Sequence, residues 1–492
     1  MLFNSPIFIF VYLPFTLALF FWIARYSTRL AAYCLFVMSL VFYAWWNPVH
    51  VPLLVGSICL NYAAGRVLAG ELKAGVRKFA LVVSICANLA VLVWFKYALF
   101  LLQAMDFSEM LFMKPETREL PLGISFFTFT QITFLVDAYR GEAREYRFGQ
   151  YGLFVTYFPH LIAGPILHHR EMMPQFQDER IYRPSVENLS VGSTLFIIGL
   201  FKKVIIADGI APYAVSFYKL AASPAELGVI EAWLGVMAFS FQIYFDFSGY
   251  SDMALGLARM FGIRMPINFY SPYKARSMVE LWRRWNMTLS RLLRDYVFVP
   301  LGGNKRSALR RYSSLLLTML IGGVWHGAGW TFVVWGILLG AMLAINHAWL
   351  AKWRRAKKSP PGFVIGAIAC AATYSCFAVA TVFFKADTLD QALRISWALW
   401  GFGAATFVGN VTLAEVAWIV ACSLIIWGLP NSLQIMYRYS PGIETFPGII
   451  QPSRFTLLEW RPNAGWATII GVMGLASLMM MNRIREFLYF AF

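Results

Sequence analysis

One histidine in an apolar segment is the first candidate for chemistry. His326 lies in the stretch GGVWHGAGW, residues 322–330, among glycines and tryptophans. A neutral imidazole can accept a proton from a hydroxyl group that attacks an acyl thioester, which is the role of a general base. A histidine buried in an apolar segment can equally serve as a hydrogen-bond partner between helices. The stretch alone supports both interpretations, and its glycines allow another backbone or a substrate to approach closely.

The other histidines have weaker contexts. His50 follows WWNPV at the end of an apolar run, and His168 and His169 lie in a loop, so we expect all three at an interface or exposed. His160 lies within FPHLIAGP, and His347 lies near the basic run KWRRAKK. The six cysteines include no CxxC pair, so the sequence indicates neither a disulfide framework nor a zinc site, and we expect no bound metal.

Four polar residues interrupt the apolar segment 239–266, FSFQIYFDFSGYSDMALGLARMFGIRMP, and form a candidate polar core: Asp246, Ser248, Asp252 and Arg259. Ionisable residues inside a membrane are costly and usually face the protein interior. Asp252 and Arg259 are seven positions apart, so a continuous helix places them on one face. We favour a structural ion pair that closes a polar cavity over a direct catalytic role for these residues.

A further segment is rich in arginine. In LWRRWNMTLSRLLRDYVFVPLGG, residues 281–303, apolar residues recur every three or four positions, which predicts one amphipathic helix with a stripe of Trp282, Trp285, Leu289, Leu292 and Tyr296. Arg291 can pair with Asp295 at i+4. The helix can lie at the cytoplasmic interface with its arginines near lipid phosphates. It can also form a basic entrance that attracts an anionic acyl donor, and the two interpretations are compatible.

The composition places these segments in a membrane protein. Of the 492 residues, 59% are apolar and only 14% are charged, whereas a soluble domain has roughly 25% charged residues. A spanning helix needs about 20 mostly apolar residues. We expect spans at about 5–24, 30–47, 51–66, 78–95, 120–138, 188–206, 228–246, 312–330, 331–351, 362–384, 415–432 and 465–482. The stretch 150–167 contains Pro159, Gly164 and Pro165, which predicts a broken or re-entrant element.

The net charge of +17 follows the same organisation. Lys and Arg cluster between the apolar runs, most densely in residues 274–311, which hold ten of them against Glu280 and Asp295. Under the positive-inside rule such clusters mark cytoplasmic loops, so we do not expect a nucleic-acid partner. Arg25 and Arg29 follow the first span, which predicts a periplasmic N-terminus.

Seven segments in this order resemble the membrane-bound O-acyltransferase superfamily, in particular its bacterial alginate O-acetyltransferase branch. They are LPLGISFFTFTQITFLVDAYRG (120–141), FPHLIAGPI (158–166), GLFKKVIIAD (199–208), FDFSGYSDMALGLARMFG (245–262), LWRRWNMTLSRLLRDYVFVPLGG (281–303), GGVWHGAGWTFVVWG (322–336) and REFLYFAF (485–492). The resemblance implies one all-α multispanning membrane domain, residues 1–492, with residues 239–351 as its catalytic core. About 11–13 transmembrane helices, with re-entrant and interfacial helices, would form a ring around a central tunnel or funnel.

The resemblance also assigns roles to residues. In this family the histidine of the WHG motif is catalytic, and it corresponds to His326. Bacterial relatives usually have RRWH where this chain has RRWN, so Asn286 stands at the position of a second histidine. An amide cannot act as a base near neutral pH, but it can donate a hydrogen bond to a carbonyl or an oxyanion. We expect the donor-side tunnel to include Trp282, Arg283, Arg284, Trp285, Arg291, Arg294, Asp295, Tyr296 and Trp325.

The implied activity is acyl transfer across the bacterial inner membrane. We expect acetyl-CoA or an acyl-carrier thioester in the cytoplasm as donor, an exported polysaccharide in the periplasm as acceptor, and no resident cofactor. Periplasmic acetyltransferase or relay proteins and membrane lipids are the expected partners. The alternatives are acylation of peptidoglycan or a teichoic-acid-like polymer, a transporter in which His326, Asp246 and Asp252 relay protons, and a non-catalytic scaffold for polysaccharide secretion. Asn286 leaves open a weakened copy or a different substrate.

Overall fold

The structure, a computed structural model, describes residues 1–105, 119–144, 147–303, 307–355, 362–403, 411–481 and 488. Over these residues the regular secondary structure is helical, with one isolated bridge between Pro266 and Ile443. The all-α class is therefore confirmed. Lys305 and Arg306, the end of KWRRAKK and all of REFLYFAF except Leu488 lie outside the described residues.

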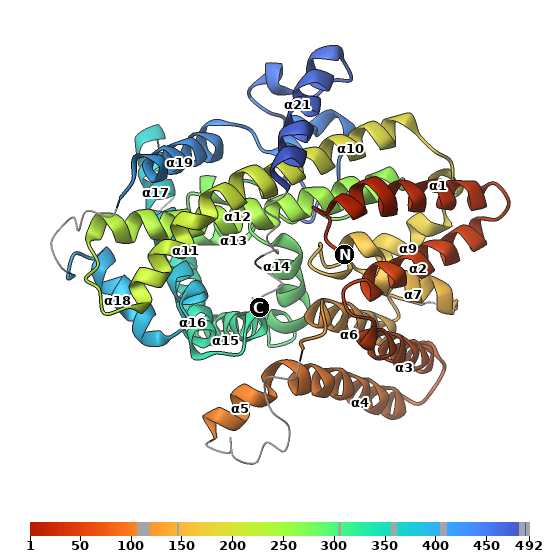
Figure 1. The fold of residues 1–492 in the computed structure, drawn as a ribbon. Helices are drawn as coiled ribbons and strands as arrows, with labels where there is room; N and C mark the ends of the chain where they lie inside the picture. Colours follow the sequence, from red (N-terminus) through yellow and green to blue (C-terminus); the bar gives the residue numbers. More distant parts are fainter. Residues whose placement is uncertain are drawn as a thin grey trace.

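The helices of the N-terminal part lie on the right and lower side of Figure 1. They are the π-helical turn η1 (Phe8–Tyr12), α1 (Leu13–Ala24), α2 (Thr28–Ala44), α3 (Val51–Ala69), α4 (Ala74–Leu92), the π-helical turn η3 (Val93–Tyr97), α5 (Ala98–Ala104), α6 (Ile124–Arg140), α7 (Phe148–Thr156), α8 (Phe158–Leu161) and α9 (His169–Gln177). The helical structure is interrupted at Tyr157 and absent over 162–168, which confirms the broken element expected at 150–167.

The remaining helices complete a ring around a central region that contains α14 (Figure 1). They are α10 (Val186–Phe201), the π-helical turn η7 (Lys202–Ala207), α11 (Asp208–Ala222), α12 (Val229–Met260), α13 (Met278–Trp282), α14 (Met287–Leu293), the π-helical turn η9 (Arg294–Phe298), α15 (Ala308–His326), α16 (Trp330–Arg355), α17 (Phe363–Lys385), α18 (Leu389–Leu399), α19 (Leu413–Ser423), the π-helical turn η11 (Leu424–Gly428), α20 (Ser432–Ile435) and α21 (Ala464–Met480).

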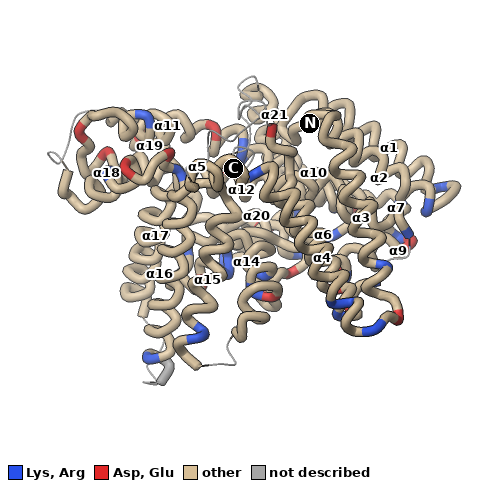
Figure 2. Tube along the Cα trace, turned by 90° about the horizontal axis from the view of Figure 1, so that it is seen from below, with Lys and Arg blue, Asp and Glu red and all other residues tan. Residues whose placement is uncertain are grey.

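Five of the described helices are long and apolar enough to cross a membrane, and four shorter apolar helices accompany them. Each expected span coincides with a helix, although three helices run well beyond the expected span, the first of them from Ala74 to Ala104. The helix that starts at Val186 continues through η7 to Ala222, and α12 continues to Met260. Figure 2 shows Lys and Arg gathered along the lower edge of the molecule, around the lower ends of α4, α15 and α16, with the N-terminus at the opposite edge.

The pair α10 and α12 packs backbone against backbone. A Cβ atom on Gly192 would lie 2.6 Å from the carbonyl oxygen of Gly256, and one on Gly199 would lie 2.5 Å from that of Gly249. The contacts run in opposite order along the two helices, so the helices are antiparallel. Small residues at a membrane helix interface allow this close approach.

The charges of the candidate polar core join α12 to α10 and to the π-helical turn η7 that follows α10. Lys203 Nζ lies 2.6 Å from Asp246 Oδ1, Lys202 Nζ lies 2.6 Å from Asp252 Oδ2, and Arg259 Nη2 lies 3.0 Å from Glu187 Oε1. The expected pair between Asp252 and Arg259 is therefore wrong. Seven residues are two helical turns, or about 10 Å along the axis, so each charge meets a different partner on the facing helix. Ser248 is buried as well, with 2% of its surface exposed.

Gly199→Ala should lower the thermal unfolding midpoint of the purified protein. The added methyl group would lie 2.5 Å from the Gly249 carbonyl oxygen, so α10 and α12 would have to separate. We expect a loss of about 1–3 kcal/mol in the free energy of unfolding. Gly471→Ala in α21 is the matched control, because a Cβ atom there meets nothing within 4 Å. Equal midpoints for the two variants would contradict the close backbone contact.

Candidate active site

His326 is the last residue of α15 and is buried, with 4% of its surface exposed. The sequence placed His326 within a longer span, over 312–330. The helix ends earlier because Gly327 has an extended backbone, with φ at −164°. Since α16 begins at Trp330, the two helices form a hairpin, and His326 lies at its tight turn.

The glycines around His326 bring the two helices of the hairpin together. A Cβ atom on Gly323 would lie 2.6 Å from the carbonyl oxygen of Phe332 and 2.7 Å from the Cα atom of Gly336. A Cβ atom on Gly327 would overlap the Phe332 ring. Of the two uses that the sequence left open for these glycines, close approach of another backbone is the one seen at Gly323.

Three aromatic rings surround the imidazole of His326. The ring centroids of Trp325, Trp335 and Phe384 lie 4.8, 5.0 and 5.3 Å from that of the imidazole, all nearly perpendicular to it. Trp325 in turn stacks on Phe129 of α6 at 5.4 Å. An apolar enclosure limits the access of water and strengthens electrostatic interactions inside it. This environment suits a base that must act on one hydroxyl group in preference to water.

Two side chains that the sequence analysis missed hold the end of α15. Lys96 Nζ donates hydrogen bonds to the carbonyl oxygens of Trp325 at 2.7 Å and His326 at 3.1 Å. Tyr97 Oη donates to the carbonyl oxygen of Val324 at 2.8 Å. Both residues belong to η3. The available signal was a lysine inside the apolar run VWFKYALF, because a charge at membrane depth is usually functional.

Asn286 interrupts the single helix predicted over residues 281–303. The first part, α13, ends at Trp282, and α14 begins at Met287. Between them Asn286 is buried and has a left-handed backbone, with φ at 39° and ψ at 57°. Asparagine tolerates this conformation better than most residues. The predicted apolar stripe is therefore wrong, and α14 is buried instead of lying at the membrane interface.

Hydrogen bonds from two other segments hold this break. The carbonyl oxygen of Asn268 accepts a hydrogen bond from the Met287 N–H at 2.9 Å, and Asn268 Oδ1 accepts one from Thr288 Oγ1 at 3.0 Å. Thr288 Oγ1 also accepts from the N–H of Ile166 at 3.0 Å. Asn268 and Thr288 thus join the start of α14 to the re-entrant segment 162–168.

Trp285, the residue before Asn286, and His326 both contact α17. The ring of Trp285, next to Asn286, lies 5.1 Å from that of Phe377, and the imidazole of His326 lies 5.3 Å from the ring of Phe384. Phe377 and Phe384 are seven residues apart, so they lie on one face of α17 about 10 Å from each other. Trp285 and His326 therefore contact the same side of this helix.

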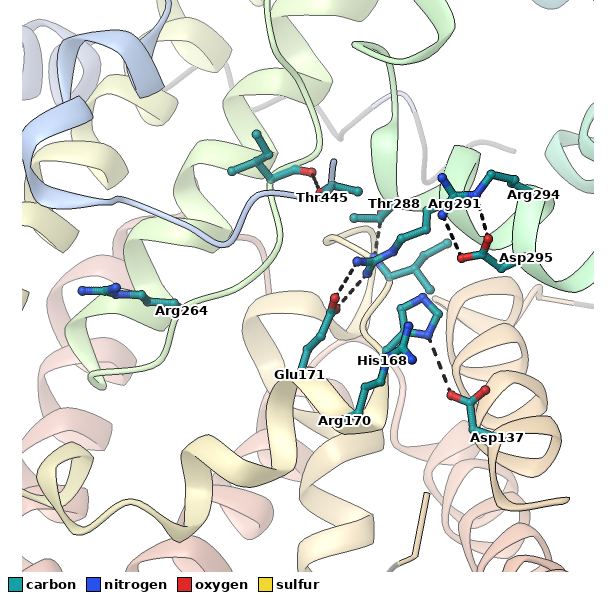
Figure 3. A network of polar contacts seen from close by, with 12 residues as sticks. Asp137, His168, Arg170, Glu171, Arg264, Thr288, Arg291, Arg294, Asp295 and Thr445 are labelled. Carbon is teal, nitrogen blue, oxygen red and sulfur yellow. Dashed lines mark hydrogen bonds and ion pairs between the residues drawn. The ribbon is translucent and has the colours of Figure 1, made fainter. Parts of the chain in front are cut away.

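A buried polar cluster lies beside α14 (Figure 3). Tyr296 Oη donates a hydrogen bond to Asp137 Oδ1 at 2.7 Å and lies 3.1 Å from His168 Nδ1. Arg291 makes two hydrogen bonds with Glu171, at 2.5 and 2.8 Å. The cluster connects α6, the residue before α9, and the segment α14–η9, so it fixes the position of the re-entrant segment.

These contacts correct two further expectations. His168 and His169 are buried, with 2% and 6% of their surfaces exposed, because the segment before α9 folds into the helical ring instead of lying at its surface. Arg291 pairs with Glu171 and not with Asp295. The chain enters the π-helical turn η9 just after Arg291, and its i→i+5 pattern shifts the register that an i+4 pair requires.

The residues expected to line a donor-side tunnel differ in burial, and a tunnel shared by them stays a prediction. Trp285 and Trp325 are buried in separate aromatic groups, Trp282 and Arg284 are half-buried, Arg283 is exposed, and Arg294 pairs with Asp295 at 2.7 Å. The break at Asn286 divides the predicted helix over 281–303, so the residues before and after it belong to different helices.

A cavity of about 930 Å³ lies between α12, the first half of α17 and η11. Its lining includes no Asp or Glu and four basic residues, Lys274, Arg276, Arg284 and Arg454. Its apolar wall includes Met237, Tyr374 and Trp427. Ser375, the last residue of α17 in the lining, is nine residues before Phe384, so the cavity wall ends about 13 Å along α17 from the ring that contacts His326.

Comparison with known proteins gives one family match and several relatives. The sequence profile of the membrane-bound O-acyltransferase family matches residues 77–384. The chain is 40% identical to a peptidoglycan O-acetyltransferase of Helicobacter pylori, over 80% of this chain and 79% of that protein. It is 38% identical to a probable alginate O-acetylase of Azotobacter vinelandii, over 87% and 83%. A teichoic acid D-alanyltransferase of Streptococcus thermophilus is 31% identical over 48% of this chain and 59% of that protein.

Tyr296→Phe should destabilise the protein, because it removes the hydroxyl group that donates to the buried Asp137 carboxylate and contacts His168. We expect a loss of about 1–3 kcal/mol in the free energy of unfolding, measured by thermal denaturation in detergent. Tyr26→Phe is the control, because that side chain is 76% exposed. If both variants unfold at the same temperature, the polar cluster does not stabilise the re-entrant segment.

Proposed function

The chain belongs to the membrane-bound O-acyltransferase family, and on this premise we propose that it acetylates hydroxyl groups of an exported polysaccharide from a cytoplasmic thioester donor. The enzyme class, an O-acyltransferase, follows from the family itself. The assignment of the site rests on the environment of His326. The histidine is buried where α15 ends, and three aromatic rings enclose its imidazole.

The names of the relatives support the choice of acyl group and acceptor. Those that match most of the chain are named for acetylation of peptidoglycan and of alginate. Both polymers contain sugar hydroxyl groups, so acetyl transfer to a polysaccharide is common to them. The D-alanyltransferase match covers 48% of the chain, which makes D-alanine transfer the less favoured alternative.

The proposed reaction uses His326 as the general base. Its imidazole takes the proton from the acceptor hydroxyl as the hydroxyl oxygen attacks the thioester carbonyl carbon. The tetrahedral intermediate then collapses, the carbon–sulfur bond breaks, and the imidazolium returns its proton to the leaving thiolate. The products are an O-acetyl ester and a free thiol. The amide of Asn286 donates a hydrogen bond to the carbonyl oxygen, where negative charge develops.

The cavity beside α17 supports the donor side of the proposal. Both expected donors, acetyl-CoA and a carrier-bound thioester, carry phosphate groups, and four basic residues without an acidic one line the cavity. Three of these, Lys274, Arg276 and Arg284, belong to the basic block 274–311, which we assign to the cytoplasm under the positive-inside rule. The protein is then a multi-pass inner-membrane protein with a periplasmic N-terminus. The acceptor polymer, or a periplasmic acetyltransferase that relays the group, approaches from the opposite edge.

His326→Ala should reduce acetyl transfer by roughly 100- to 10,000-fold, the usual contribution of a general base. The measurement is the rate at which O-acetyl groups accumulate on surface polysaccharide, followed by mass spectrometry in a deletion strain that expresses the variant. His347→Ala is the matched control, because that histidine lies on the exposed side of α16. Transfer by His326→Ala at the wild-type rate would remove His326 from the mechanism.

Asn286→Gly should reduce transfer by about 100- to 1,000-fold, the usual loss when one donor to an oxyanion is removed. Glycine adopts the left-handed backbone of residue 286 without strain, so the variant isolates the side-chain amide. Asn286→His, which restores the residue usual in bacterial relatives, should retain transfer because histidine also tolerates this conformation. Wild-type rates in both variants would show that the side chain at 286 takes no part.

A further inference from the structure

We infer that Lys96 and Tyr97 are positioning residues that fix the end of α15, and with it His326, for acyl transfer; this inference rests on the proposed role of His326. The last carbonyl groups of a helix lack partners within the helix. In a membrane domain no bulk water is available to satisfy them, so the protein must supply the donors. A helix that ends here, as α15 does, therefore needs hydrogen-bond donors from elsewhere in the protein, and Lys96 and Tyr97 supply them.

Side chains, and not the following backbone, complete this helix end. Many helices end with a left-handed glycine whose N–H turns back onto the last carbonyl groups. Gly327 is extended instead, and three consecutive carbonyl oxygens, those of Val324, Trp325 and His326, accept hydrogen bonds from Tyr97 and Lys96. The positive charge of a lysine also complements the partial negative charge at a helix C-terminus.

The ammonium group of Lys96 is fully engaged by this arrangement. It has three N–H donors, and they match three acceptors: the Trp325 carbonyl oxygen at 2.7 Å, the His326 carbonyl oxygen at 3.1 Å and Ser125 Oγ at 3.4 Å. Nζ also lies 5.9 Å from the centroid of the Trp325 ring, and the face of an aromatic ring attracts a cation. A group held this way is suited to fix geometry and has no donor left for a substrate.

The origin of these side chains supports a functional role. Lys96 and Tyr97 are adjacent, and both reach the end of α15 from the π-helical turn η3, which lies within the long helix from Ala74 to Ala104. The i→i+5 pattern of such a turn costs regular helical hydrogen bonds, and π-helical turns are frequent at functional sites.

Positioning matters here because the clamp, the set of hydrogen bonds from Lys96 and Tyr97 to the end of α15, acts on the backbone of the reacting residue itself. One hydrogen bond of Lys96 goes to the carbonyl group of His326, and another goes to the residue before it. A displacement of about 1 Å in a catalytic group can reduce a rate by roughly 100-fold. Loss of the clamp would move the imidazole relative to both the donor and the acceptor without removing any reacting atom.

The test compares three variants of the full chain in a deletion strain, at equal abundance in the membrane. Lys96→Met, which keeps the length of the side chain but removes its charge and donors, should slow O-acetyl accumulation by roughly 10- to 100-fold. Lys96→Arg, which keeps charge and donors, should recover most of the rate. Lys219→Met is the matched control and should transfer at the wild-type rate, because Lys219 lies in the last turn of α11 and is exposed.

Two outcomes would overturn the inference. One is a wild-type rate for Lys96→Met while His326→Ala is inactive; the other is a slow Lys96→Met that Lys96→Arg does not rescue at equal abundance and equal unfolding temperature. If His326→Ala itself transfers at the wild-type rate, the proposed function fails before the inference is reached. If Lys96→Met does not accumulate, Tyr97→Phe decides, because it removes one hydroxyl group only. We expect it to be several-fold slower than wild type, and an unchanged rate would overturn the inference.

Discussion

Backbone groups that a helix end leaves unpaired inside a membrane protein must find partners within the protein. Three interruptions in the centre of this fold meet that requirement: the end of α15 at His326, the break at Asn286 and the re-entrant segment 162–168. Each is paired with a group from another segment of the chain, and the groups are those of Lys96, Asn268 and Thr288. The candidate active site is built from these interruptions, because an uninterrupted helix would place neither His326 nor Asn286 at a turn.

Several polar and charged side chains in the interior follow the same rule, and four of them lie in π-helical turns. Lys96 lies in η3, Lys202 and Lys203 open η7, and Tyr296 lies in η9. Each of these side chains contacts a carboxylate or a carbonyl group on another helix. An isolated charge would be costly at this depth. The extra residue of a π-helical turn changes which face a side chain occupies, so a charge in an otherwise apolar helix can point inward.

Much of the fold follows from the sequence because hydropathy reports directly on what must be in lipid. The twelve expected spans coincide with helices, and Pro159, Gly164 and Pro165 correctly indicate a broken element. Predictions that rested on helical periodicity across a longer segment were less successful. The stripe in residues 281–303 is continuous in the sequence, yet the chain breaks at Asn286, because hydrogen bonds from Asn268 hold the start of α14 at that point.

The sequence by itself determined the membrane class, the family and the two candidate residues, because composition and local motifs carry that information. The tertiary structure decided which groups pair with which. Asp252 meets Lys202 and not Arg259, and Arg291 meets Glu171 and not Asp295, since side chains reach partners on facing helices more easily than residues two turns away or beyond a change of helical register. It also showed that Lys96 reaches the end of α15, a contact across 229 positions that no local pattern contains.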